Sequence, residues 1–103
     1  MKFDNYQKKT GETAVYPEEN AVEYLALGLN GEAGEVAEKI KKSIRDDKEL
    51  GDDLRDEIGD CLWYIARLLD ELGYDMSEAA DANIDKLFDR KERGQIQGSG
   101  DDR

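Results

Sequence analysis

Residues 54–72 read LRDEIGDCLWYIARLLDEL, and this stretch decides the fold. Its apolar residues recur every three or four positions, which places them on one face of an α-helix. These residues are Leu54, Ile58, Cys61, Leu62, Ile65, Leu68, Leu69 and Leu72. Asp52 or Asp53 before the stretch and Gly73 after it are residue types typical of helix starts and ends. The stretch therefore predicts an amphipathic helix whose broad apolar face must be covered.

Two further helices are expected on either side of it. The first runs from Pro17 to Ile44, because proline suits a first helical turn and an apolar ladder follows. The last runs from Ser77 to about Arg93, and the residues between Ile44 and Leu54 are polar and predict a loop. We expect an all-α fold of antiparallel helices with a four-helix-bundle-type core. Because a chain of 103 residues buries little apolar surface alone, we expect oligomerisation to complete this core.

Three segments follow from this pattern. Residues 1–16 have no sustained period and predict an N-terminal arm, either a short helix or an extended segment. Residues 17–93 form the helical domain. Residues 94–103, GQIQGSGDDR, contain three glycines and predict a mobile tail.

The composition excludes several functions. Lysine and arginine number 15 against 26 acidic residues, so the formal charge is -11 and no basic face for nucleic acid is expected. There is no histidine and only one cysteine, which excludes histidine-dependent catalysis and cysteine-cluster metal sites. No apolar run is long enough to span a membrane, and the N-terminus lacks the apolar core of a signal peptide. We expect a cytoplasmic protein.

Two pairs of acidic residues carry the functional argument. Glu32 and Glu35 lie three residues apart in the first long helix, and Glu57 and Asp60 do so in the second. Residues at this spacing share a helix face, so each pair can converge on one point. If the two helices pack side by side, four carboxylates meet in a partly buried place. Such a cluster needs a cation, and oxygen ligands suit Mg²⁺ or Mn²⁺.

Simpler interpretations stay open at this stage. Acidic pairs three residues apart are common in a chain so rich in acids, where they often form a solvated helix face. Gly31, Gly34 and Gly59 stand beside the two pairs and favour the metal site, because glycine in a helix is costly and opens room.

The last helix supplies candidate phosphate ligands. Asn83, Lys86 and Arg90 are three and four residues apart, so they share one face. Lysine and arginine there would grip phosphate groups, or would simply form ion pairs on a solvated surface. Tyr64, one turn after Asp60, is expected to face the site and contact a base or sugar, whereas Trp63 is expected in the core or an interface. Cys61 is expected to be buried and unreactive.

Two stretches of the sequence resemble the signature of a known enzyme family. The strings GLNGEAGEVAE at 28–38 and LRDEIGD at 54–60 are similar to the E-E-x-x-E and E-x-x-D signature of MazG-like nucleoside triphosphate pyrophosphohydrolases. Glu32, Glu35, Glu57 and Asp60 match that signature, while Gly31 replaces the first acid of the doublet. The pattern N-x-x-K-L followed by Arg90 also fits, and the ending GSGDDR resembles that of short phage and bacterial members.

The resemblance implies an activity. Such enzymes convert a nucleoside triphosphate and water to the monophosphate and pyrophosphate, by attack of water at the α-phosphorus. Their carboxylates hold Mg²⁺, they are all-α, and they assemble as homodimers or homotetramers. Their substrates are often deoxynucleotides or non-standard nucleotides, which places them in nucleotide metabolism and upkeep of the dNTP pool. By this likeness Glu32, Glu35, Glu57 and Asp60 are the catalytic and metal-binding residues, and Asn83, Lys86, Arg90 and Tyr64 bind substrate.

Two alternatives remain from the sequence. One is a helical interaction protein without catalysis, whose acidic face binds a basic partner. The other is a related helical pyrophosphohydrolase with another diphosphate substrate, such as phosphoribosyl-ATP. No partner nucleic acid or membrane is expected in any of these cases.

Overall fold

The computed structural model describes all 103 residues, and it contains four α-helices and no strand. The helices are α1 (Phe3–Thr10), α2 (Ala21–Asp46), α3 (Asp52–Glu71) and α4 (Met76–Glu92), with short 3₁₀ turns at Gly11–Thr13 and Glu18–Asn20. The all-α prediction is therefore confirmed. No helix is long and apolar enough to cross a membrane.

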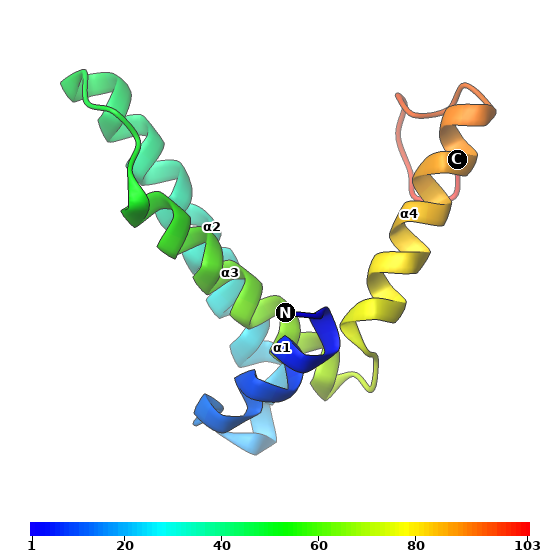
Figure 1. Ribbon diagram of the computed structural model, residues 1–103, viewed down its shortest axis with the longest axis horizontal. Coiled ribbons are helices and arrows are strands. Elements are labelled where there is room, and N and C mark those ends of the chain that lie inside the picture. The colour runs from blue at the N-terminus through cyan, green and yellow to red at the C-terminus, as the bar shows by residue number, and fades with distance from the viewer.

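The centre of the fold is a hairpin of α2 and α3, which run antiparallel and lie side by side along one arm of the molecule (Figure 1). Its core is small: Leu25 of α2 and Ala66 of α3 are fully buried. Asp47 ends α2 in the left-handed conformation, with φ of 52°, and Gly51 precedes α3 in an extended one. The predicted loop between the two helices therefore shrinks to residues 47–51.

The N-terminal arm is a helix that joins the hairpin to α4. The buried side-chain amide of Gln7 donates a hydrogen bond of 2.9 Å to the carbonyl of Tyr74 and accepts one of 3.0 Å from the backbone N–H of Met76. Asp4 accepts two more bonds from Ser77, one from its backbone N–H and one from its hydroxyl. These contacts fix the start of α4, and they span about seventy residues of sequence that no local pattern connects.

Helix α4 then leaves the hairpin, and the two arms form an open V (Figure 1). The radius of gyration is 16.4 Å, whereas a compact domain of this length has about 13 Å. A single chain therefore does not build the four-helix core expected from the sequence. The completion of that core by other copies stays a prediction.

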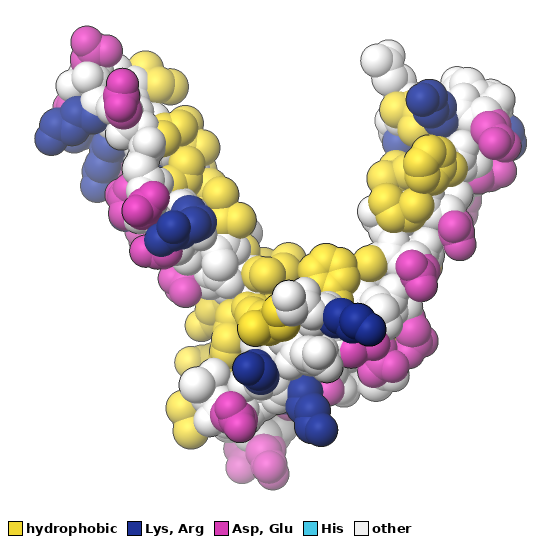
Figure 2. All heavy atoms as spheres, in the orientation of Figure 1, with side chains coloured by type: hydrophobic (Ala, Val, Ile, Leu, Met, Phe, Trp, Pro, Cys, Tyr) yellow, Lys and Arg dark blue, Asp and Glu magenta, His cyan; other side chains and the backbone are white.

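The arms leave apolar surface open to solvent. Figure 2 shows hydrophobic side chains along the edges of both arms that face the opening of the V. The buried apolar core of the whole chain consists of four residues, namely Ala21, Leu25, Ala66 and Met76. Large apolar side chains that are more than one-third exposed include Leu27, Ile44, Ile58, Ile65, Ile84, Leu87 and Phe88.

Candidate metal and nucleotide site

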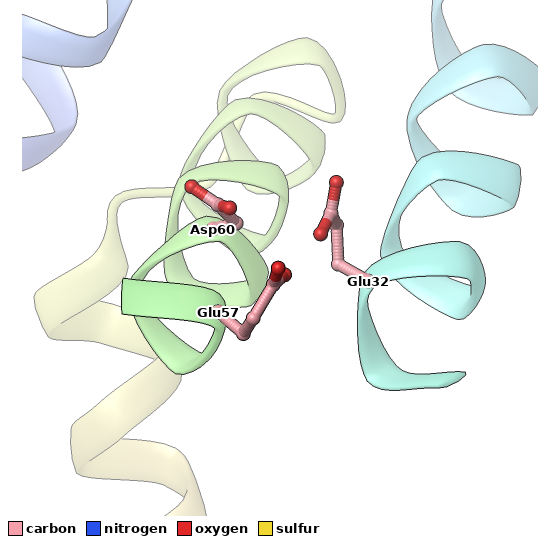
Figure 3. Close-up of side chains that lie close together, drawn as sticks. All are labelled: Glu32, Glu57 and Asp60. Atoms are coloured by element: carbon pink, nitrogen blue, oxygen red, sulfur yellow. The ribbon is translucent and has the colours of Figure 1, made fainter. Parts of the chain in front are cut away.

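Three carboxylates from the two helices of the hairpin converge. Glu32 projects from α2 toward Glu57 and Asp60 of α3, and each offers an oxygen within 4.8 Å of the others (Figure 3). Glu57 and Asp60 lie one turn apart because of their three-residue spacing, and the antiparallel packing brings Glu32 opposite them. Glu32 and Glu57 are partly buried, whereas Asp60 is exposed.

The electrostatics of this cluster are those of crowded like charges. A hydrogen bond from a protonated Glu32 to Glu57 raises the pKa of Glu32, and partial burial and the charges of Glu57 and Asp60 raise it further. No lysine or arginine makes an ion pair with any of the three carboxylates. A positive charge placed among them would offset this repulsion and favour the ionised form of Glu32.

A second observation shows that the donor set fits a cation. Oε2 of Glu57 is buried and has no hydrogen-bond partner, although buried carboxylate oxygens are normally satisfied. A hard divalent ion binds oxygen ligands, and Mg²⁺ commonly uses one or two carboxylates together with water and substrate phosphates. The three converging side chains match those requirements.

Glu35, the fourth predicted acid, does not join these three. It is exposed one turn further along α2 and lines a different cavity of about 290 Å³ that extends toward the hairpin tip. Lys39 spans this region in an ion pair with Asp53 at 3.4 Å. The structure thus brings together three of the four acids singled out in the sequence.

An open cavity of about 350 Å³ lies beside the carboxylates. Its lining consists of Thr13, Glu32, Asp60, Trp63 and Tyr64. Tyr64, which was expected to face the site, lines this cavity, and its contact with a base or sugar stays a prediction. Trp63 is only partly buried and lines the same cavity, in edge-to-face contact with Tyr64, so it is not part of the buried core of this chain. Its place in an interface between chains stays a prediction.

Sequence reasoning missed Thr13 because the N-terminal arm has no periodic pattern. Its hydroxyl accepts a 2.9 Å hydrogen bond from the indole N–H of Trp63 and so orients the ring. The one available signal was the lone tryptophan next to Tyr64 and one turn from Asp60. Periodicity alone assigns such an aromatic residue to a core.

The glycines near the acidic pairs behave differently from one another. A Cβ on Gly28 would lie 2.6 Å from Cζ of Tyr64, so this glycine admits the aromatic ring against α2. Gly31, Gly34 and Gly59 have open space at the same position. A close approach within the chain therefore explains Gly28 and not the other three.

The predicted phosphate ligands lie on the other arm. Asn83, Lys86 and Arg90 belong to α4, which contacts α1 and α3 but diverges from the hairpin (Figure 1). Asn83 is exposed, Lys86 is half-buried and Arg90 is buried. Both cations contact Asp101 of the tail. Within one chain they therefore do not meet the carboxylates.

Cys61 is half-buried, which corrects the expectation of a buried side chain. Burial, followed by the charges of Glu32, Asp60 and Glu57, raises the pKa of its thiol. A thiol in such acidic surroundings is a poor nucleophile, in agreement with the unreactive role expected for it.

The chain belongs to the MazG nucleotide pyrophosphohydrolase domain family, whose model matches residues 20–94. This span contains the hairpin, its carboxylate cluster and the whole of α4. The chain is also 43% identical to the "Gene 37 protein" of Mycobacterium phage L5 over an alignment of 114 residues that covers all of both proteins. No solved structure gives a significant match.

Proposed function

We propose that this protein is a Mg²⁺-dependent nucleoside triphosphate pyrophosphohydrolase, which forms a nucleoside monophosphate and pyrophosphate by attack of water at the α-phosphorus. Membership of the family supports the reaction class. The observation that carries the assignment to this site is the convergence of three carboxylates around the unpartnered Oε2 of Glu57. We expect the activity in the cytoplasm, with ribo- or deoxynucleotides as substrates.

Glu32, Glu57 and Asp60 would hold the metal, with Glu35 as a further ligand once substrate is bound. When bound, Mg²⁺ (or Mn²⁺) supplies positive charge that neutralises the phosphates and the charge developing on them. The chain's own task is to position the reactants. A carboxylate oxygen of Glu32 or Glu35 would accept a proton from the attacking water.

The aromatic cavity would hold the nucleoside. Trp63 and Tyr64 line it directly beside Glu32 and Asp60, so a base packed there leaves its phosphates near the carboxylates. Stacking of a base on an aromatic ring contributes about 1–3 kcal/mol and tolerates different bases. The cavity is open, which fits a site that accepts several nucleotides.

Phosphate binding requires cations, and no lysine or arginine of the hairpin forms an ion pair with Glu32, Glu57 or Asp60. Lys86, Arg90 and Asn83 would supply this contact from α4 of a second copy of the chain. The exposed apolar edges of both arms support such an assembly, because a second copy would cover them (Figure 2). We therefore propose a homodimer, or a homotetramer built from such dimers, with each site made from two chains.

The test is release of pyrophosphate from a panel of ribo- and deoxynucleoside triphosphates, with Mg²⁺ or Mn²⁺ and after chelation. We expect metal-dependent release, and a loss of at least about a hundredfold in Glu57→Gln and Asp60→Asn. Asp56→Asn is the matched control, because Asp56 is exposed on α3 and pairs only with Arg55. Activity that persists in the first two variants would contradict the metal assignment. Hydrolysis of phosphoribosyl-ATP in place of the nucleoside triphosphates would show that the assigned substrate is wrong.

A further inference from the structure

The C-terminal segment, residues 94–103, folds back on α4, where Asp101 contacts Lys86 and Arg90. Oδ1 of Asp101 lies 3.0 Å from Nζ of Lys86 and 3.1 Å from a terminal guanidinium nitrogen of Arg90. The same guanidinium nitrogen also donates to the backbone carbonyl of Asp101. One carboxylate oxygen thus accepts from both cations, as an oxygen of a bound phosphate group would.

The segment forms a defined loop around this contact. Arg103 donates hydrogen bonds to the carbonyls of Gln95, Ile96 and Gly100, at 3.0, 2.9 and 2.6 Å. Gly98 and Gly100 have positive φ of 131° and 85°, which glycine adopts at little cost. Arg103 and the glycines therefore fold the segment into a closed loop that presents Asp101 to α4.

The two sides of the contact differ in exposure. Arg90 is 4% exposed, because the loop lies over it, whereas the side chain of Asp101 is 81% exposed. The hydrogen bonds and charges of Lys86 and Arg90 lower the pKa of Asp101, so its carboxylate is ionised at neutral pH. An anion from solvent can compete for Lys86 at once, but it reaches Arg90 only when the loop moves.

We propose that residues 94–103 are a strap whose Asp101 occupies the anion-binding position of Lys86 and Arg90, and that a polyphosphate displaces it. This inference rests on the proposed role of Lys86 and Arg90 as phosphate ligands. A polyphosphate carries several negative charges against the single charge of Asp101, so the exchange favours the ligand. The strap keeps both cations paired in the free protein and releases them when a polyphosphate arrives.

The test uses the full-length chain, without divalent metal, titrated with inorganic tripolyphosphate in a calorimeter at constant ionic strength. We expect Asp101→Asn to bind about tenfold more tightly than the wild type, because the ligand no longer competes with a charged group. Asp102→Asn is the matched control, since it makes the same charge change next to Asp101 at an exposed residue. It should bind like the wild type. Lys86→Ala should bind more weakly.

Amide hydrogen exchange gives an independent measurement. Tripolyphosphate should speed exchange at residues 95–103 in the wild type and leave that of α2 unchanged. Equal affinity of Asp101→Asn and wild type, equal tightening in both asparagine variants, or absence of tripolyphosphate binding would each overturn the proposal. None of these measurements involves hydrolysis, so they are independent of whether the chain cleaves nucleotides.

Discussion

The phenol ring of Tyr64 on α3 packs against the backbone of Gly28 on α2, in the space that any other residue would fill with its Cβ. The ring also lines the cavity beside the carboxylates. One glycine therefore sets both the spacing of the hairpin and the position of an aromatic wall of the candidate site.

Gly28→Ala is expected to displace the ring and destabilise the protein. Overpacking costs about 1–3 kcal/mol, which outweighs the gain of up to about 1 kcal/mol from alanine in a helix. Gly31→Ala is the matched control, because its Cβ would meet open space, so only the gain applies. Urea unfolding of both variants checks this. A Gly28→Ala protein as stable as Gly31→Ala would show that Tyr64 moves away at no cost.

Divalent metal is expected to stabilise the protein through the carboxylate cluster. Binding to the folded state adds about 2.7 kcal/mol when the free ion is at 100 times its dissociation constant. Thermal unfolding with rising Mg²⁺ or Mn²⁺ measures this directly. In the metal-free protein, Glu57→Gln should raise the melting temperature, because it removes like-charge repulsion, and it should reduce the gain from metal. If Mg²⁺ raises the melting temperature of this variant as much as that of the wild type, the ion binds elsewhere.

A site made from two chains should show complementation between inactive variants. Glu57→Gln lacks a metal ligand and Lys86→Ala lacks a phosphate contact, so each alone should be nearly inactive. If the two variants are unfolded, combined in equal amounts and refolded together, half of the dimers contain one chain of each variant. One of the two sites in each such dimer is intact. The mixture should then regain about a quarter of the wild-type rate. A mixture no more active than the average of its components would refute the shared site.

Trp63 is the only tryptophan, so its fluorescence reports on the cavity. Binding of a nucleoside triphosphate is expected to change the emission, because a base stacks beside the indole. Trp63→Leu should raise KM about tenfold while kcat changes little, in keeping with stacking of about 1–3 kcal/mol. Inorganic tripolyphosphate, which has no base, is the matched ligand control and should leave the emission unchanged.

The contact between Asp4 and Ser77 is expected to make stability depend on pH. Hydrogen bonds from the Ser77 hydroxyl and backbone N–H lower the pKa of Asp4 in the folded state. The stability it contributes is therefore present above the pKa of an aspartate in the unfolded chain, and is lost as pH falls through the lower, folded value. Asp4→Asn should melt at a lower temperature than wild type at pH 7, and the difference should shrink in acid. Asp81→Asn, an exposed site on α4, is the control, and a constant difference for Asp4→Asn would refute the link.

The three longer helices were predictable because periodicity and end signals agree along most of the chain. The predicted start at Pro17 was wrong, because a 3₁₀ turn at Glu18–Asn20 follows the proline and α2 begins only at Ala21. The predicted start at Leu54 and end at Leu72 differ from those of α3 by one or two residues. The N-terminal helix was not resolved by pattern, since α1 has eight residues and is held by distant contacts of Gln7 and Asp4. Such contacts depend on the tertiary fold and leave no periodic signal.

The site was predictable in part. Spacing alone placed Glu57 and Asp60 on one face, and the hairpin then brought Glu32 to them. Spacing did not separate Glu35 from the cluster, because the direction of each side chain depends on how the helices cross. The sequence pattern also did not predict the distance between α4 and the carboxylates. That distance depends on the angle at which α1 and residues 73–75 direct α4 away from the hairpin.

If a second chain completes the site, as proposed, the open V makes activity depend on the abundance of the protein. If both the apolar edges and the phosphate contacts need a second chain, a newly made chain is inactive until it meets another. At low protein concentration, total pyrophosphohydrolase activity then rises more steeply than in proportion to the number of chains. Below a threshold rate of synthesis, most chains would stay unpaired and nucleotides would not be hydrolysed.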